Sequence, residues 1–149
     1  MNLYDYVDKL NARYRTGIST EHSFRGDLQN LLESLIRDVI VTNEPARIAC
    51  GAPDYILTKK GIPVGYIEAK DLGADLGHKI YKEQFDRYKA SLNNLIITNY
   101  LDFWLYRDGV FVTSISLGAI VNSKVAGNTD KYEQFEALIK EFSTYAGQT

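Results

Sequence analysis

Residues 53–70 read PDYILTKKGIPVGYIEAK. Two short segments, 53–58 and 63–70, are rich in β-branched and aromatic residues. A polar turn centred on Gly61 separates them. This pattern predicts a β-hairpin with a loop of a few residues. We expect the rest of the chain to be organised around that hairpin.

The charged residues of this stretch stand at the same end of the predicted hairpin. Asp54 lies near the start of the first strand, and Glu68 and Lys70 lie near the end of the second. An antiparallel hairpin brings those two ends together, and residues two apart in a strand leave the same face. The sequence therefore predicts that two carboxylates and an amine meet at one end of a sheet.

Such a trio has a chemical use. Mg²⁺ is usually held by one or two carboxylates, with water and substrate phosphate completing its coordination. The ion can position a water and lower its pKa for attack on a phosphodiester. Lys70 would stabilise the developing negative charge or help to deprotonate that water. Metal-dependent phosphodiester hydrolysis is thus the leading hypothesis, and the alternative is that Asp54, Glu68 and Lys70 are ordinary solvated charges.

These residues also carry a family resemblance. Pro53-Asp54 and Glu68-Ala69-Lys70 resemble the Pro-Asp…(Asp/Glu)-x-Lys motif of the PD-(D/E)XK nuclease superfamily. Gln84 and Tyr88 resemble the Gln-x-x-x-Tyr element of its RecB-like and Mrr-like branches. Glu21 precedes a long amphipathic segment, where this superfamily often carries another acidic metal ligand.

A closer resemblance covers residues 18–117. Segments 51–54, 65–70 and 94–100 are similar to the N-terminal nuclease domain of single-chain type ISP restriction-modification enzymes. The resemblance implies that 1–149 is one nuclease domain, with an N-terminal helix at 1–17, a PD-(D/E)XK core at 18–117, and a loop and closing helix at 118–149. It also implies an N-terminal fragment of a longer protein with helicase-like, methyltransferase and target-recognition domains.

The resemblance assigns roles to individual residues. Asp54 and Glu68 would bind Mg²⁺, for which Mn²⁺ would substitute, together with the Ala69 carbonyl and Glu21 through a water. Lys70 would act on the transition state or on the water, and Gln84 would orient the nucleophile. The expected products are a 5′-phosphate and a 3′-hydroxyl.

Composition is that of one ordinary globular domain. The chain has 149 residues and a formal charge of −2, so bulk charge does not indicate strong autonomous binding to nucleic acid. Residues 1–10 are mixed in charge and lack the apolar region of a signal peptide, and no apolar run approaches the roughly 20 residues of a membrane span. A single cysteine, Cys50, excludes an internal disulfide and fits a reducing compartment. We expect a cytoplasmic protein that acts on double-stranded DNA, delivered by other domains.

Apolar periodicity predicts helices at 1–17, 21–38, 78–92 and 132–145. Glu21 has a second explanation as an acid at a helix N-terminus, and His22 and Arg25 could reach the same cleft as Asp54. The helix at 78–92 is the most basic segment. Its candidate DNA contacts are Lys79, Lys82, Arg87 and Tyr88. The alternative is pairing of the cations with Glu83 and Asp86, with Tyr88 in the core.

The remaining strands are expected at 46–49, 94–99, 102–106 and 110–115, and 118–130 reads as a loop. Asp108-Gly109 predicts a tight hairpin. Trp104, Tyr106 and Phe111 are expected to be core or cross-strand residues, with a base-stacking platform as the less favoured alternative. The predicted fold class is α/β, with a restriction-endonuclease-like core and a mixed central β-sheet flanked by α-helices.

Two other functions fit the same fold. One is a catalytically silent DNA-binding or protein-docking module, because fold does not determine function. The other is a structure-specific nuclease such as a junction resolvase. For the endonuclease itself we expect weak sequence specificity, because no element is suited to reading base edges.

Overall fold

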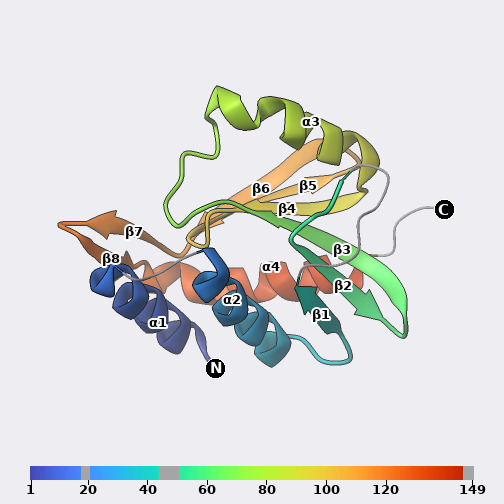
Figure 1. Ribbon diagram of the computed structural model, residues 1–149. Helices are drawn as coiled ribbons and strands as arrows, with labels where there is room; N and C mark the ends of the chain where they lie inside the picture. Colours follow the sequence, from blue (N-terminus) through green and yellow to red (C-terminus); the bar gives the residue numbers. More distant parts are fainter. Residues whose placement is uncertain (18–20, 44–50, 146–149) are drawn as a thin grey trace.

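The computed structural model describes residues 1–17, 21–43 and 51–145, except for the side chains of residues 21–23. The described elements form three layers, with a six-stranded sheet between two layers of helices (Figure 1). Helix α3 (Lys82–Ser91) covers one face of the sheet. Helices α1 (Leu3–Thr16), α2 (Glu21–Leu35) and α4 (Tyr132–Thr144) cover the other face. The predicted mixed sheet flanked by helices is confirmed.

The sheet has the order β1-β2-β3-β4-β5-β6. Its strands are Ile40–Asn43, Tyr55–Lys59, Ile62–Ala69, Asn94–Thr98, Asp102–Arg107 and Val110–Ser116. Strands β3 and β4 are parallel, and the other neighbouring pairs are antiparallel. The β3–β4 connection passes over one face and carries a short 3₁₀ helix, η1 (Lys79–Tyr81), followed by α3.

The predicted hairpin is the pair β2–β3. Tyr55 lies opposite Ile67, and Lys59 lies opposite Ile62. The two turn residues, Lys60 and Gly61, have φ angles of 53° and 80°, the left-handed values that a tight two-residue hairpin turn requires. Glycine adopts this conformation without the steric cost of a Cβ atom.

Two apolar clusters hold the layers together. The larger one joins α1, α2 and α4 to one face of the sheet, and includes the fully buried side chains of Leu28, Phe103 and Phe135. The smaller one joins α3 to the other face through Phe85, Tyr88 and neighbouring residues. Because α3 is only ten residues long, its position depends on this packing more than on helix propensity.

Several elements differ from the sequence-based expectation. Helix α2 ends at Leu35 rather than Asp38, and Asp38 has a φ angle of 62° that no helix residue adopts. The expected loop at 118–130 contains a small hairpin, β7 (Gly118–Val121) with β8 (Lys124–Gly127), and a 3₁₀ helix, η2 (Thr129–Lys131). Side-chain alternation is weak there, and contacts between β8 and α1 stabilise the hairpin.

The helix expected at 78–92 is divided into η1 and α3. Residues 40–43, where the sequence predicted no strand, form β1. The strand expected at 46–49 and Cys50 lie outside the described residues. Within the described part of the chain, no helix has the length and apolar character needed to cross a bilayer.

Gly65 provides a test of the packing between the sheet and α4. A Cβ atom at this position would lie 2.5 Å from Cζ of Phe142, whose ring is fully buried. We expect Gly65→Ala to lower the free energy of unfolding by about 1–3 kcal/mol, because overpacking forces the ring to shift. Chemical denaturation of the variant measures this loss.

The matched control is Gly26→Ala on α2, where a Cβ atom would meet no heavy atom within 4 Å. This change should be neutral or stabilising by up to about 1 kcal/mol, because alanine favours helix. The double variant Gly65→Ala/Phe142→Leu should lose less stability than the sum of the single changes. Strict additivity would contradict the proposed clash.

Candidate active site

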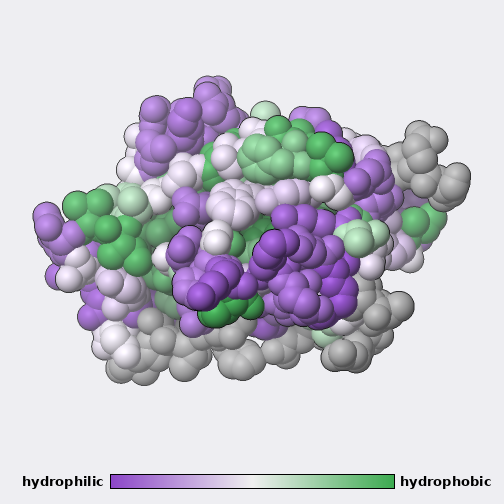
Figure 2. All heavy atoms as spheres, turned by 90° about the horizontal axis from the view of Figure 1, so that it is seen from above, coloured by the Kyte–Doolittle hydropathy of each residue, from purple (hydrophilic) through white to green (hydrophobic). Residues whose placement is uncertain are grey.

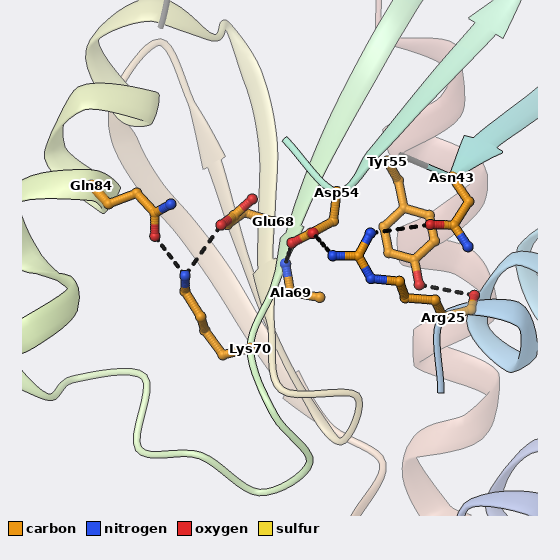
Figure 3. Close-up of polar contacts among 8 residues, drawn as sticks. All are labelled: Arg25, Asn43, Asp54, Tyr55, Glu68, Ala69, Lys70 and Gln84. Atoms are coloured by element: carbon orange, nitrogen blue, oxygen red, sulfur yellow. Dashed lines mark hydrogen bonds and ion pairs between the residues drawn. The ribbon is translucent and has the colours of Figure 1, made fainter. Parts of the chain in front are cut away.

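The predicted charged residues meet in a pocket of about 390 Å³, where β2 begins and β3 ends. Asp54 immediately precedes β2, Glu68 lies near the end of β3, and Lys70 follows that strand. Gln84 reaches the same pocket from α3. Figure 3 shows Lys70 between Glu68 and Gln84, and Asp54 between Ala69 and Arg25. The convergence that the hairpin predicted is therefore present.

The Asp54 carboxylate is held at both of its oxygen atoms. The backbone N–H of Ala69 donates a hydrogen bond of 2.7 Å to Oδ2, and the Arg25 guanidinium pairs with Oδ1. Arg25 also donates to Oδ1 of Asn43 on β1 at 3.3 Å. Asp54 is 8% exposed. The carboxylate is consequently fixed in orientation by a strand on one side and by α2 on the other.

Glu68 is the most perturbed group of the site. It is 4% exposed, and its Oε1 is buried with no hydrogen-bond donor among the described residues. Lys70 Nζ donates to the other oxygen at 3.3 Å. Burial, followed by the negative charge of Asp54, raises the pKa of Glu68 to about 8, although Lys70 opposes this shift. Burial and the neighbouring Asp54 thus favour the neutral form of Glu68, and its buried Oε1 receives no hydrogen bond from the described residues.

The Lys70 ammonium has a defined environment. Nζ donates to Oε1 of Gln84 at 2.5 Å as well as to Glu68. It also lies 5.0 Å from the centre of the Tyr81 ring and 5.7 Å from that of Phe85. Aromatic faces attract cations. These contacts hold the amine beside the carboxylates in a pocket that remains open to solvent.

The donors of the pocket fit a hard divalent cation. Buried, paired carboxylate oxygens with one unsatisfied acceptor are the ligands that Mg²⁺ and Mn²⁺ prefer. Two protein carboxylates are enough for Mg²⁺, which keeps several waters. Among the described residues, no group of three or more His, Cys, Asp or Glu side chains is arranged to hold a metal ion. A cation here would therefore rely on backbone, water and substrate oxygens as further ligands.

Other predicted residues are placed differently. Glu21 is the first residue of α2, but its side chain lies outside the described part of the structure, as does that of His22. Arg25, three residues further along α2, does reach the pocket residue Asp54. Ala69 contributes its N–H to Asp54, and a role for its carbonyl as a metal ligand stays a prediction.

The predicted DNA contact of Tyr88 is wrong. Its side chain is 1% exposed and packs in the cluster beneath α3, because the apolar stripe of this short helix needs the ring for its attachment to the sheet. Lys82 pairs with Asp86 at 2.5 Å and Arg87 pairs with Glu83 at 2.6 Å, the i,i+4 contacts of the alternative interpretation. Lys79 is exposed.

Tyr81 is a pocket residue that the sequence interpretation missed. Its ring lies beneath the Lys70 ammonium and lines the pocket with Gln84. The signal was the spacing of three residues between Tyr81 and Gln84, which places both on one side of a helix.

No family model matches the chain, and no curated protein matches it. A solved structure described as the cryo-EM structure of a DrdV–DNA complex contains a chain of similar fold, with a TM-score of 0.68 and 21% sequence identity. The match covers 96% of this chain and 14% of that chain. The fold is thus α/β and restriction-endonuclease-like, with a mixed central sheet flanked by helices.

The raised pKa of Glu68 predicts how stability depends on pH. Between its ordinary pKa of 4.5 and the folded-state value of about 8, the folded protein holds a proton that the unfolded chain has released. The stabilising effect of that proton is complete below the lower value and is lost as the pH rises through the higher one. In EDTA, we expect the melting temperature to fall by several degrees between about pH 5.5 and about pH 8.5.

Glu68→Gln is the matched variant, because its side chain has the same shape and does not titrate. The difference in melting temperature between Glu68→Gln and the unmodified protein should grow in favour of the variant as the pH rises. Equal pH profiles for the two proteins would show that Glu68 is not the titrating group.

Proposed function

We propose that this chain is a metal-dependent DNA endonuclease domain of the PD-(D/E)XK superfamily, and that it nicks duplex DNA with little intrinsic sequence specificity. The observation that carries the proposal is the pocket itself. Asp54, Glu68 and Lys70 from the β2–β3 hairpin and Gln84 from α3 converge there, with one carboxylate oxygen left without a donor among the described residues. A purely structural domain has no physical need for this costly arrangement.

Each residue of the pocket would have a distinct role in metal binding or in positioning. Asp54 and Glu68 would hold Mg²⁺, together with the backbone carbonyl of Ala69 and, through a water, Glu21. When bound, the cation supplies neutralisation of phosphate charge and lowers the pKa of water. Arg25 positions the Asp54 carboxylate and offsets its charge. Glu68 keeps the Lys70 ammonium close to the pocket.

Lys70 and Gln84 act on the substrate side. The ammonium group at Nζ donates hydrogen bonds to the negative charge that develops on the phosphate oxygens in the transition state. If Nζ is instead deprotonated, it accepts the proton of the attacking water. Gln84 Oε1 holds Nζ in place, and its amide nitrogen is left to orient the water or a phosphate oxygen.

DNA is the proposed substrate for two reasons. The similar chain belongs to a structure described as a DNA complex. The pocket is also open at the protein surface, so the backbone of a polymer could pass across it. Since the chain spans 14% of the length of that similar chain and carries a net charge of −2, we propose that further domains deliver the DNA. Helicase-like, methyltransferase and target-recognition domains are the expected ones.

A plasmid assay tests the proposed reaction. The chain should convert supercoiled plasmid to the nicked form with Mg²⁺ or Mn²⁺ and not with EDTA. Asp54→Asn and Lys70→Met should each lower the rate by at least about 100-fold, because each removes a group that acts on the reacting phosphate. Lys140→Met removes the same charge from the exposed face of α4 and should leave the rate unchanged.

Equal nicking by all four proteins would place the activity elsewhere or in a contaminant, and would refute the proposed site. Preference for branched over plain duplex DNA would favour a junction resolvase. Circular dichroism of each variant verifies that the fold is intact.

Mn²⁺ binding tests the metal site apart from the reaction. Calorimetry should detect saturable binding of Mn²⁺ to the unmodified chain, and binding should weaken by at least about tenfold in Glu68→Gln, because the amide replaces a charged ligand. Lys140→Met is again the control. Absence of both Mn²⁺ binding and nicking would indicate the catalytically silent module.

A further inference from the structure

A second pocket lies behind α3, on the side of the helix away from the catalytic residues. Tyr81 and Gln84 line the pocket that contains Asp54, Glu68 and Lys70, which we call the catalytic pocket. The second pocket, which we call the rear groove, is lined from α3 by Lys82, Phe85, Asp86 and Lys89. Its volume is about 260 Å³. It is closed on one side by the segment 76–79 and below by Trp104 of β5.

The floor of the rear groove is aromatic, and further aromatic side chains lie between it and the edge of the sheet. Phe85 and the half-buried Trp104 line it directly. Tyr106, two residues along β5 from Trp104, shares its face of the strand. The Tyr106 ring packs edge-on against Phe111 of β6, with 5.7 Å between ring centres. Phe111 is 52% exposed, whereas Tyr106 itself is buried.

The rim of the rear groove is cationic. It carries Lys79, Lys82 and Lys89 with Asp86, a formal charge of +2 in a chain whose net charge is −2. Lys82 and Lys89 share the single carboxylate of Asp86, at 2.5 and 4.0 Å. Lys89 Nζ also lies 4.5 Å from the centre of the Tyr106 ring. Positive charge therefore lies along the rim of the groove and, at Lys89, over the neighbouring Tyr106 ring.

Figure 2, which looks down on the face that carries α3, shows hydrophilic surface adjoining a hydrophobic patch at one edge of the molecule. On β6, the last strand of the sheet, Val110, Phe111 and Val112 are all exposed. The groove, whose wall includes Trp104 of β5, therefore lies one strand away from this exposed edge strand.

We propose that the rear groove binds unpaired nucleotides of single-stranded DNA. Bases would stack on the Trp104 side of the floor, and the lysines would contact phosphates. Aromatic side chains stack on any base, and a cationic groove follows the backbone, which together give binding without sequence preference. In a duplex the faces of the bases are covered, so the aromatic floor would serve no purpose for intact double-stranded DNA.

The groove and the catalytic pocket share α3 as a common wall, since Gln84 and Phe85 are adjacent in sequence and line different pockets. The groove would therefore hold an unpaired strand close to the site of cleavage. The choice of DNA as ligand rests on the proposed function, but the binding itself requires neither the metal nor the catalytic residues.

Trp104 makes the test direct, because it is the one tryptophan of the chain. In EDTA, a thymidine oligonucleotide of about 12 residues should quench its fluorescence in a saturable manner. An abasic oligonucleotide of equal length and charge should quench much less. A duplex of the same length and a poly-glutamate peptide should bind more weakly than the oligonucleotide.

Variants identify the groove as the binding site. Lys79→Gln and Lys89→Gln should each weaken binding by roughly three- to tenfold at low salt, because each removes a phosphate contact. Lys140→Gln, on the opposite face of the sheet, should bind like the unmodified chain. For Trp104→Ala, polarisation of a labelled oligonucleotide should report weakened binding, with circular dichroism confirming the fold.

Several results would overturn the inference. The first two are an absence of quenching and equal quenching by the abasic oligonucleotide. The others are binding of the duplex or the peptide as tight as that of the thymidine oligonucleotide, and an equal loss of affinity in Lys89→Gln and Lys140→Gln. Asp54→Asn should retain full binding. Plasmid nicking that fails while quenching persists would remove the proposed function alone, and the reverse result would remove the rear groove alone.

Discussion

The hydrogen bond from the Ala69 backbone to Asp54 is the contact on which the site depends. Its length of 2.7 Å ties a carboxylate that precedes β2 to the end of β3. It forms only when the two strands pair in the register that sets Tyr55 against Ile67. A slip of one residue would turn Glu68 and Lys70 to the opposite face of the sheet, toward α4 instead of α3. Because alternate residues of β3 pack in two different apolar clusters, the register and the chemistry are fixed together.

The burial of two neighbouring carboxyl groups is the cost of this arrangement. Asp54 and Glu68 are both buried, and burial together with the charge of Asp54 raises the pKa of Glu68. Arg25 offsets the charge of Asp54 from α2, and Lys70 offsets that of Glu68 from β3. Neither cation reaches the buried Oε1 of Glu68, for which the described residues provide no donor. Stability is thereby lowered at the position where the proposed cation would restore it.

Helix α3 brings several properties together within a few residues. Its apolar side chains anchor it to the sheet, Gln84 holds the Lys70 amine, and its outer side carries the lysines of the rear groove. The exposed ion pairs along it contribute little to stability, because solvent screens them. The lysine and arginine side chains of these pairs place positive charge on the surface of α3, in a chain whose net charge is −2.

The sequence by itself determined the features that depend on near neighbours. Side-chain alternation and turn chemistry, which act over a few residues, account for the β2–β3 hairpin, the Asp108-Gly109 turn and the last helix. They also account for the convergence of Asp54, Glu68 and Lys70.

Only the tertiary structure decided which contacts form between distant segments. It placed Arg25 on Asp54, buried Tyr88, put Tyr81 under Lys70 and folded 118–127 into a hairpin against α1. A tyrosine or arginine on a helix can lie in the core, at the solvent-exposed surface or in a functional site. Which of these it does depends on the side chains of the element that packs against the helix, and no local sequence pattern contains that information.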